Sequence, residues 1–317
     1  MGFKACNVDL TSIDQDDGTY CISTGDDVDG LVSSISEIGL MALPILKETS
    51  GKFKIICGFR RIKACSHLSW SKIDTRLLSA RSTHFECAQL AIADNSMQRT
   101  LNLLEISRAL DLLANCFSDD EQLVKAAKTL NLPDNIAAIN KIKTICRLPR
   151  KIQKNVLLDN ISLVVALSLA KMEHKDGMAL AGLFAKLKTG LNKQREIVTL
   201  ITEIALREEI SVQDLINMPV VQDIVNHPDI DRNRKTAKIR IYLKQRRYPA
   251  ICNAEKEFEK NLKHLKLGSG ISLVPPSHFE GRQYTLSLLF KNLPEFARLT
   301  DTLNRIADHP ALEKILH

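Results

Sequence analysis

The fold of this chain is limited above all by a junction at residue 58, where a strand-like run meets a helix-like run. Residues 52–57, KFKIIC, contain the alternation and the β-branched side chains typical of a strand. Gly58 ends this run, and FRRIKACSHL then reads as a helix. Residues 44–48, PILKE, predict a partner strand joined by a turn over residues 48–51, and residues 27–43 predict a helix that stops at Gly39. The expected order is helix, hairpin, helix.

The chain is almost wholly helical in pattern from about residue 85 to 174. Ser118 and Glu121 have the spacing of a capping box, which predicts a helix start. Asn131 follows where a tight turn needs left-handed dihedrals, and Pro133 suits the first turn of a further helix. Helix, tight turn and helix together predict a helix-turn-helix. The helices are expected within residues 86–95, 100–117, 120–130, 135–145, 150–158 and 162–172.

The last third predicts a helical region and then a small mixed unit. Residues 185–260 are helical in pattern and carry a basic run at 232–247. After the GSG of residues 268–270, strands are expected near 271–276 and 282–290, and a helix at 293–308. We therefore expect an α+β fold that is predominantly helical, with domains at 1–92, 93–180, 181–265 and 266–317.

Composition excludes several protein classes. With 317 residues the chain can form two or three domains. The apolar run that starts at Ile161 is shorter than a membrane span, and no signal-peptide pattern is present, so a cytoplasmic protein without membrane partner is expected. The eight cysteines lack zinc-ligand spacing, which predicts reduced thiols. The net charge of +7 suits a partner that carries phosphates without identifying one.

Four segments, taken in order, resemble the ParB-like proteins of chromosome and plasmid partition. In the first, Gly39 and Pro44 correspond to the family pattern S-I-x-x-x-G-x-x-x-P, with the proline one residue late. In the second and third, GFRRIKA at 58–64 corresponds to G-E-R-R-x-x-A, and ADNSMQRTLNLLE at 93–105 corresponds to E-N-x-x-R followed by L-x-x-x-E. The fourth is the helix-turn-helix at 123–132 with the segment 147–167 after it. The resemblance implies a ParB/sulfiredoxin-like N-terminal α/β domain, an all-helical helix-turn-helix domain and a small C-terminal α+β unit.

The glycine junction has the chemistry of a phosphate site. A glycine lets the backbone approach a phosphate, the helix start supplies N–H donors, and arginine forks bind phosphate oxygens in pairs. The resemblance implies that this segment holds CTP and that an acid–amide pair helps to bind Mg²⁺. The implied nucleotide residues are Gly39, Gly58, Arg60, Arg61 and Asn95, and the implied metal ligands are Asp94 and Asn95. Alternatively, the arginines are solvated or paired with carboxylates, and Asp94 and Asn95 cap a helix.

The chain departs from the family pattern at several positions. Phe59 replaces the glutamate of G-E-R-R, which removes a carboxylate and predicts at most a weak CTPase. Gln98 takes the usual arginine position, and Arg99 lies one residue beyond it. Residues 164–167, VVAL, replace the G-H-x-R segment associated with DNA reading and suit a core helix. Cys57 precedes Gly58 instead of following it, which excludes the G-C-H-R site of sulfiredoxin.

Two segments carry polar faces suited to DNA. In the second helix of the helix-turn-helix and just beyond it, polar residues alternate with isoleucines, and those expected to contact DNA are Asn135, Asn140, Lys141, Lys143, Thr144, Arg147 and Arg150. An ordinary amphipathic helix with a solvated side is the alternative. The basic run 232–247 is either a nucleic-acid stripe or a solvated amphipathic helix.

These features lead to a hypothesis of a DNA-binding protein gated by a cytidine nucleotide. By the resemblance, it acts in plasmid or chromosome partition or in transcription regulation, with double-stranded DNA, CTP and Mg²⁺ as ligands. It would form a homodimer, for which residues 271–317 are the candidate domain, would be associated with the nucleoid or a plasmid, and could have a partner ATPase. The alternatives are an enzyme on the same fold, a nuclease or phosphotransferase, and a scaffold that binds only proteins.

Overall fold

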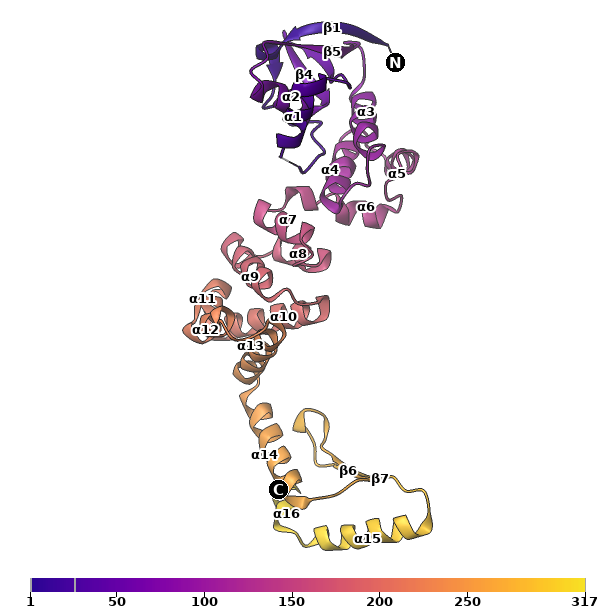
Figure 1. Ribbon diagram of the computed structural model, residues 1–317. Helices are drawn as coiled ribbons and strands as arrows, with labels where there is room; N and C mark the ends of the chain where they lie inside the picture. The colour runs from indigo at the N-terminus through magenta and orange to yellow at the C-terminus, as the bar shows by residue number, and fades with distance from the viewer. Residues whose placement is uncertain (1, 26, 317) are drawn as a thin grey trace. The chain divides into compact units, whose positions relative to one another are not determined.

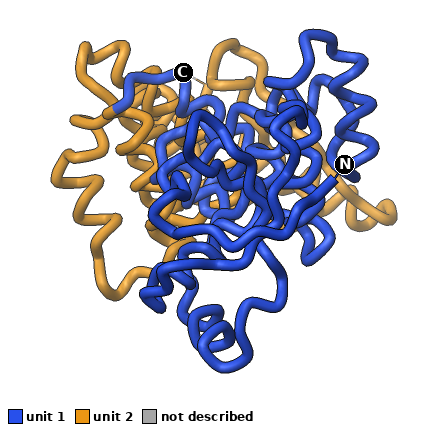
Figure 2. Tube along the Cα trace, turned by 90° about the horizontal axis from the view of Figure 1, so that it is seen from above, with its two compact units in different colours: residues 1–174 blue, residues 175–317 orange. Residues whose placement is uncertain are grey.

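The structure, a computed structural model, describes residues 2–25 and 27–316 (Figure 1). The chain divides into two compact units (Figure 2). The first unit is Met1–His174 and the second is Lys175–His317. Helices predominate and strands occur in both units, so the expected α+β class is confirmed. The predicted domain boundary at 92/93 falls inside the helix His84–Ser96, and the boundary at 180/181 falls inside the helix His174–Leu187, whose first residue is the last residue of the first unit.

Within the described part of the first unit, five strands form one mixed sheet in the order β1-β5-β3-β4-β2. Strand β3 is antiparallel to β4 and parallel to β5, and β1 is antiparallel to β5. Ser50 and Gly51 both have positive φ, as a two-residue hairpin turn requires, so the predicted hairpin is confirmed. Strands β1, β2 and β5 were not predicted. The strands are β1 Phe3–Asp9, β2 Ile13–Asp14, β3 Ile45–Thr49, β4 Lys52–Cys57 and β5 Lys72–Leu78, with a 3-10 turn at Leu10–Ser12.

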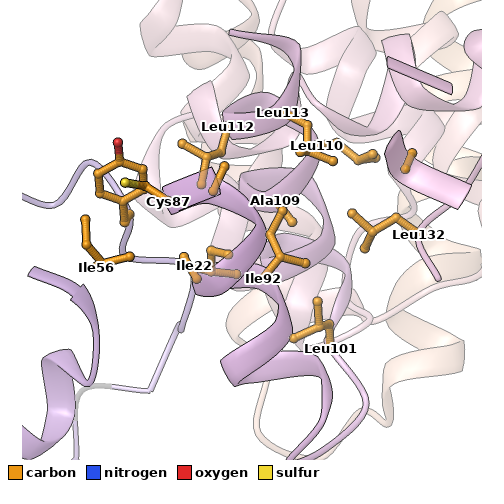
Figure 3. Close-up of a cluster of buried hydrophobic side chains, with 14 of the residues drawn as sticks. Ile22, Ile56, Cys87, Ile92, Leu101, Ala109, Leu110, Leu112, Leu113 and Leu132 are labelled. Atoms are coloured by element: carbon orange, nitrogen blue, oxygen red, sulfur yellow. The ribbon is translucent and has the colours of Figure 1, made fainter. Parts of the chain in front are cut away.

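Helices cover both faces of this sheet. On one face, helices α1 (Asp29–Ile38) and α2 (Phe59–His67) pack on a cluster that includes Ile55. On the other face, α3 (His84–Ser96) and α4 (Leu103–Ala114) pack on a cluster that includes Ile56 (Figure 3). Neighbouring residues of a strand point to opposite faces, so β4 contributes to both cores immediately before it ends at the glycine junction.

The rest of the first unit is helical, and two helices with a turn between them lie where the sequence predicts a helix-turn-helix. Asn131 has a φ of 54°, which confirms the left-handed turn. The predicted capping box is wrong, because the N-cap is Asp119, whose carboxylate accepts the N–H groups of the first turn. Pro133 lies before the second helix and not in its first turn. The elements are α5 Asp120–Thr129, α6 Ile136–Ile142, a 3-10 turn Ile145–Arg147, α7 Arg150–Leu157 and α8 Leu163–Leu169.

The second unit begins with helices and ends with a small subdomain that contains both strands and helices. Its helices are α9 His174–Leu187, α10 Leu191–Glu208, α11 Val212–Asn217, α12 Pro219–Asn226, α13 Arg232–Arg247, α14 Pro249–Leu265, α15 Leu293–Ala307 and α16 Pro310–Leu316. Strands β6 (Ile271–Val274) and β7 (Thr285–Leu288) pair antiparallel, which confirms the strands expected there, and a 3-10 turn lies at Ser277–Phe279. A small apolar core joins α14 and α16 to this hairpin.

Two expectations about the whole chain can be compared with the described residues. No helix among residues 2–25 and 27–316 combines the length and the apolar character needed to cross a bilayer. In the same residues no disulfide is formed, and Cys57, Cys65, Cys87 and Cys252 are buried as small apolar side chains.

Candidate nucleotide site and helix-turn-helix

The junction at residue 58 has a backbone that only glycine fits. Gly58 precedes α2 with φ 93° and ψ 26°, in the left-handed region. A Cβ atom built there would lie 3.1 Å from the Cα atom of Pro44 and 3.1 Å from Nε of Arg61. The backbone therefore turns tightly from β4 into α2, and the N–H groups at the start of α2 have no capping side chain at this position.

A cavity of about 390 Å³ opens beside this turn. Its lining comes from the β4–α2 junction, from the end of α3 and the segment after it, and from the start of α1 and the segments on both sides of that helix. The lining includes Ile22, Ser23, Leu31, Ala42, Gly58, Phe59, Arg60, Arg61, Asp94, Asn95, Gln98 and Arg99. The structure thus brings together all the predicted nucleotide and metal residues except Gly39. Gly39 ends α1, with φ 77°, and is not among the lining residues.

Both arginines of the junction have partners within the protein. Arg61 donates from Nη2 to Oδ2 of Asp94 at 2.9 Å and from Nη1 to the Ala42 carbonyl at 2.9 Å. Arg60 donates from Nη2 to the Asp27 carbonyl at 2.7 Å. Of the two interpretations given for these arginines, pairing with a carboxylate therefore holds for Arg61. The Arg61 side chain is 14% exposed, at the wall of the cavity.

Asp94 and Asn95 belong to the last turn of α3, so they do not cap a helix start. Asn95 donates its amide N–H to the Ala91 carbonyl at 2.8 Å. No group of three acidic, histidine or cysteine side chains gathers as a metal site within the described ranges. The donor set therefore fits a Mg²⁺ ion only in the manner common for nucleotide complexes, with one protein carboxylate and most ligands from phosphates and water. Asp94 would have to break its ion pair with Arg61 before it could coordinate the ion.

Arg99 is the residue whose role the sequence left uncertain. It lines the cavity, yet its guanidinium makes a bidentate pair with Glu105, at 2.6 Å for each bond. Glu105 also accepts the N–H of Thr24 at 3.0 Å and the N–H of Asn102 at 3.1 Å. The pair therefore ties the end of the E-N-x-x-R segment to α4 and to the segment before α1.

Glu105 is a buried carboxylate held in its charged form. Its side chain is 1% exposed. Burial acts to raise the pKa of this carboxyl, but the hydrogen bonds from Arg99, Thr24 and Asn102 outweigh it and lower the pKa to about 2. Sequence reasoning used Glu105 only as the end of the L-x-x-x-E match. The signal that could have found it was the Asn102–Glu105 spacing of a capping box, which the structure contains.

The predicted DNA-binding residues fall into two groups. Asn140 and Lys141 are exposed on α6, and Arg150 is exposed at the start of α7. Others are engaged: the Asn135 side chain caps α6 by accepting the Ala138 N–H at 3.1 Å, and Arg147 pairs with Asp111 at 2.6 Å. The remaining predicted residues, Lys143 and Thr144, follow the last turn of α6.

A larger groove of about 910 Å³ lies between α4, α7 and the segment 18–24. Arg108, Arg150 and Lys154 line it, and Arg108 donates to the Ser23 carbonyl. Sequence reasoning did not single out Arg108, because a lone arginine in an amphipathic helix gives no signal of its own.

Comparison with known proteins finds similarity to a curated relative and to solved structures. No protein-family model matches the chain. A curated nucleoid occlusion protein of Oceanobacillus iheyensis is 28% identical over 150 residues, which are 47% of this chain and 50% of the relative, so the match spans half the relative's length. A C-terminally truncated ParB from Caulobacter crescentus, complexed with CTP-gamma-S, aligns with 57% of this chain and 99% of its own at 17% identity and a TM-score of 0.27. A Pnob8-like ParB-N domain aligns with 75% and 98% at 14% identity and a TM-score of 0.34.

The chain is thus similar to a nucleoid occlusion protein over part of its length, and its motifs resemble the ParB pattern with departures. Its divergence from the ParB pattern has a structural counterpart at two positions. Phe59, in place of the motif glutamate, packs against the cores on both faces of the sheet. In the segment that replaces G-H-x-R, Val165 and Ala166 are buried in α8 as a core helix requires, whereas Val164 is 47% exposed.

Proposed function

We propose that this ParB-like chain binds duplex DNA under the control of a cytidine nucleotide held beside Gly58. The observation that carries the proposal is the cavity in which Gly58, Arg60, Arg61, Asp94 and Asn95 meet. Its volume, about 390 Å³, is within the range of small-ligand sites. Uncapped N–H groups and two guanidinium groups favour a polyanion. The cytidine base is inferred from the motif resemblance alone.

Binding would proceed by exchange of partners at Arg61. In this structure the carboxylate of Asp94 neutralises the Arg61 guanidinium at 2.9 Å. A triphosphate offers several charges and bidentate acceptors, so it competes well for the guanidinium. The released Asp94 would then be free, with the carbonyl oxygen of Asn95, to bind a Mg²⁺ ion that the phosphates also hold. The ion would reduce repulsion between the phosphates and Asp94.

The site favours binding over turnover. Phe59 lines the cavity where the family motif has a carboxylate, and its ring is packed against both cores. A phenyl ring can neither position a water molecule as a base nor bind a metal. We therefore favour a nucleotide-gated switch, with weak hydrolysis at most, over a nuclease or phosphotransferase.

The nucleotide site and the helical part of the first unit are linked by side chains, which gives gating a route. Arg99 of the cavity wall is paired with Glu105 of α4, and α4 in turn packs against α5 and α6. DNA contact would involve Asn140, Lys141 and Arg150. Partition, nucleoid occlusion and transcription regulation are all consistent with such a switch. The cellular site would be the nucleoid or a plasmid, and a partition role would require a partner ATPase.

We also propose that the chain forms a homodimer through its C-terminal subdomain, residues 271–317. Strands β6 and β7 form a hairpin whose outer edges are not paired within the described chain. Exposed apolar side chains lie on β7, on the segment after it and at the start of α15, namely Leu286, Leu289, Phe290, Leu293 and Phe296. A second copy could extend the sheet and cover these side chains, because an isolated hairpin with an exposed apolar face is marginally stable.

Calorimetric titration with CTP, ATP and GTP in Mg²⁺ buffer tests the nucleotide site. We expect CTP to bind, Arg61→Ala to weaken it by about 10-fold or more through the loss of a charge-assisted pair, and the exposed Arg81→Ala control to leave it unchanged. The absence of heat with every nucleotide would overturn the gated switch.

Fluorescence anisotropy with a labelled duplex, with and without CTP, tests the gating. We expect CTP to change the duplex affinity of the parent chain and not that of Arg61→Ala. A chain that binds neither nucleotide nor DNA would instead be a scaffold that binds only proteins.

A further inference from the structure

Helix α13 (Arg232–Arg247) is divided into two halves with different surroundings. Its C-terminal half is fixed by ion pairs: Arg240 with Glu196 at 2.7 Å, Arg247 with Glu203 at 2.7 Å, and Arg246 with Glu208. Hydrogen bonds from Arg246 and Arg207 hold the pKa of Glu208 at about 2, so this acid stays charged at all ordinary pH values. Lys244 pairs with Glu255 at 2.8 Å. The basic run is therefore not one continuous exposed stripe, because its C-terminal half forms ion pairs with neighbouring helices.

The N-terminal half of α13 is different, because its charges face solvent. Arg232, Lys235 and Lys238 form no ion pair that the structure describes, and Arg232 and Lys238 are exposed. The acidic residues nearby are Asp229 and Asp231 in the preceding turn. Asp231 is the N-cap, with Oδ1 accepting the N–H groups of Asn233 and Arg234, and its Oδ2 lies 3.4 Å from Nε of Arg234.

One face of this half presents a set of side chains suited to base edges. Asn233 and Arg234 occupy the first turn, Ala237 and Lys238 the second, and all four are exposed. Asparagine pairs with adenine, arginine and lysine with guanine, and an alanine methyl group contacts thymine. A short turn connects helix α12 (Pro219–Asn226) to α13. Asn226, the last residue of α12, accepts a 2.9 Å hydrogen bond from Lys186 of α9.

The neighbouring helix extends the positive surface. Helices α10 and α13 run in the same direction, since Glu196 pairs with Arg240 and Glu203 with Arg247. Lys193 lies one turn before Glu196 on α10, so it is on the side that faces the free half of α13, and it is exposed.

We propose that the N-terminal half of α13, with Lys193 of α10, is a second contact surface for duplex DNA, separate from the helix-turn-helix of the first unit. The proposal does not rest on the nucleotide switch or on α6. A membrane surface fits less well, because Ile239 and Leu243 of α13 are buried in the protein, and the exposed Ile241 lies in the C-terminal half of the helix, outside the proposed surface. The exposed basic side chains would contact DNA phosphates, and the side chains of the first two turns would contact base edges.

The test is fluorescence anisotropy of the full chain with a labelled duplex over a series of salt concentrations. The double variant Arg232→Ala/Lys238→Ala removes two exposed charges. It should lower affinity roughly 10- to 100-fold at 0.1 M salt and reduce the slope of log K against log salt by about 2. The control Lys256→Ala/Lys260→Ala makes the same charge change on exposed positions of α14 and should leave both quantities unchanged. The variant Lys141→Ala/Lys143→Ala is measured beside them for the α6 surface.

The outcomes separate the two DNA surfaces. Equal affinity of the α13 variant and the parent would overturn this proposal, and a loss with the α6 variant in the same experiment would leave the proposed function standing. An equal loss of affinity in the α14 control would also overturn the proposal. In a separate assay, the parent and the α13 variant are sedimented with anionic phospholipid vesicles. The proposal would be overturned if the α13 variant lost vesicle binding but kept its affinity for the duplex. On the unaltered chain, bound duplex should protect Lys235 and Lys238 from acetylation, read by mass spectrometry, and full acetylation of both would equally contradict the proposal.

Discussion

Replacing Glu105 by glutamine should destabilise the first unit at neutral pH. Glutamine keeps the size of the side chain, but its amide places N–H donors against the donors of Arg99 and Asn102. The pKa of Glu105 falls from its usual value near 4.5 to about 2 in the folded chain. Since one pKa unit corresponds to about 1.4 kcal/mol, the charged form contributes about 3 kcal/mol. Arg99 is 46% exposed and can be hydrated when its partner is lost, so we expect a cost of about 2 to 3 kcal/mol.

The chain has a convenient probe for this measurement. Its single tryptophan, Trp70, lies in the first unit and packs against the core on the α1 and α2 face, so its fluorescence reports unfolding of that unit. Urea denaturation of the parent and Glu105→Gln gives the difference in the free energy of unfolding. Glu37→Gln, an exposed position on α1, is the matched control and should change this free energy by less than about 0.5 kcal/mol.

The same experiment has a definite pH dependence. The folded pKa of Glu105 is lowered, so its contribution is complete above its unfolded pKa, near 4.5, and is lost as pH falls towards about 2. The difference between the parent and Glu105→Gln should therefore shrink between pH 4.5 and pH 2. A difference below about 1 kcal/mol at pH 7, or one that stays constant down to pH 2.5, would refute the reasoning.

Three further changes have expected outcomes. Gly58→Ala should destabilise the first unit by about 2 kcal/mol or more in urea denaturation, because its φ is 93° and the new Cβ lies 3.1 Å from the Cα of Pro44; an unchanged midpoint would contradict the account of the turn. Leu289→Glu, at a side chain 79% exposed, should shift sedimentation equilibrium from dimer to monomer, and a persistent dimer would exclude this surface. Arg246→Ala should lower the thermal midpoint of the second unit because it removes the paired cation of Glu208, and an unchanged midpoint would show that the pair contributes nothing.

Local features of the fold could be predicted from the sequence. The β3–β4 hairpin and the glycine junction are encoded by neighbouring residues, since Ser50 and Gly51 form the turn and Gly58 supplies the left-handed backbone. Strands β1 and β5 could not be found in the same way. They pair residues as far apart as Phe3 and Leu78, and such a register depends on the tertiary fold.

The site was predictable in its residues but not in its contacts. The motif positions lead to Gly58, Arg60 and Arg61, and the cavity contains them. The sequence could not show that Asp94 neutralises Arg61, because the two residues are brought together by packing of α3 beside the junction. In the basic run, likewise, only tertiary structure separates charges that pair with α10 from those that face solvent.

The central claim is that the paired arginines beside Gly58 hold a triphosphate. Its most direct test is a crystal structure of the chain grown with cytidine triphosphate and Mg²⁺. We expect phosphate oxygens within hydrogen-bonding distance of the Arg60 and Arg61 guanidinium groups, with Arg61 separated from Asp94. An empty cavity at saturating nucleotide, with Arg61 still 2.9 Å from Asp94, would contradict the account.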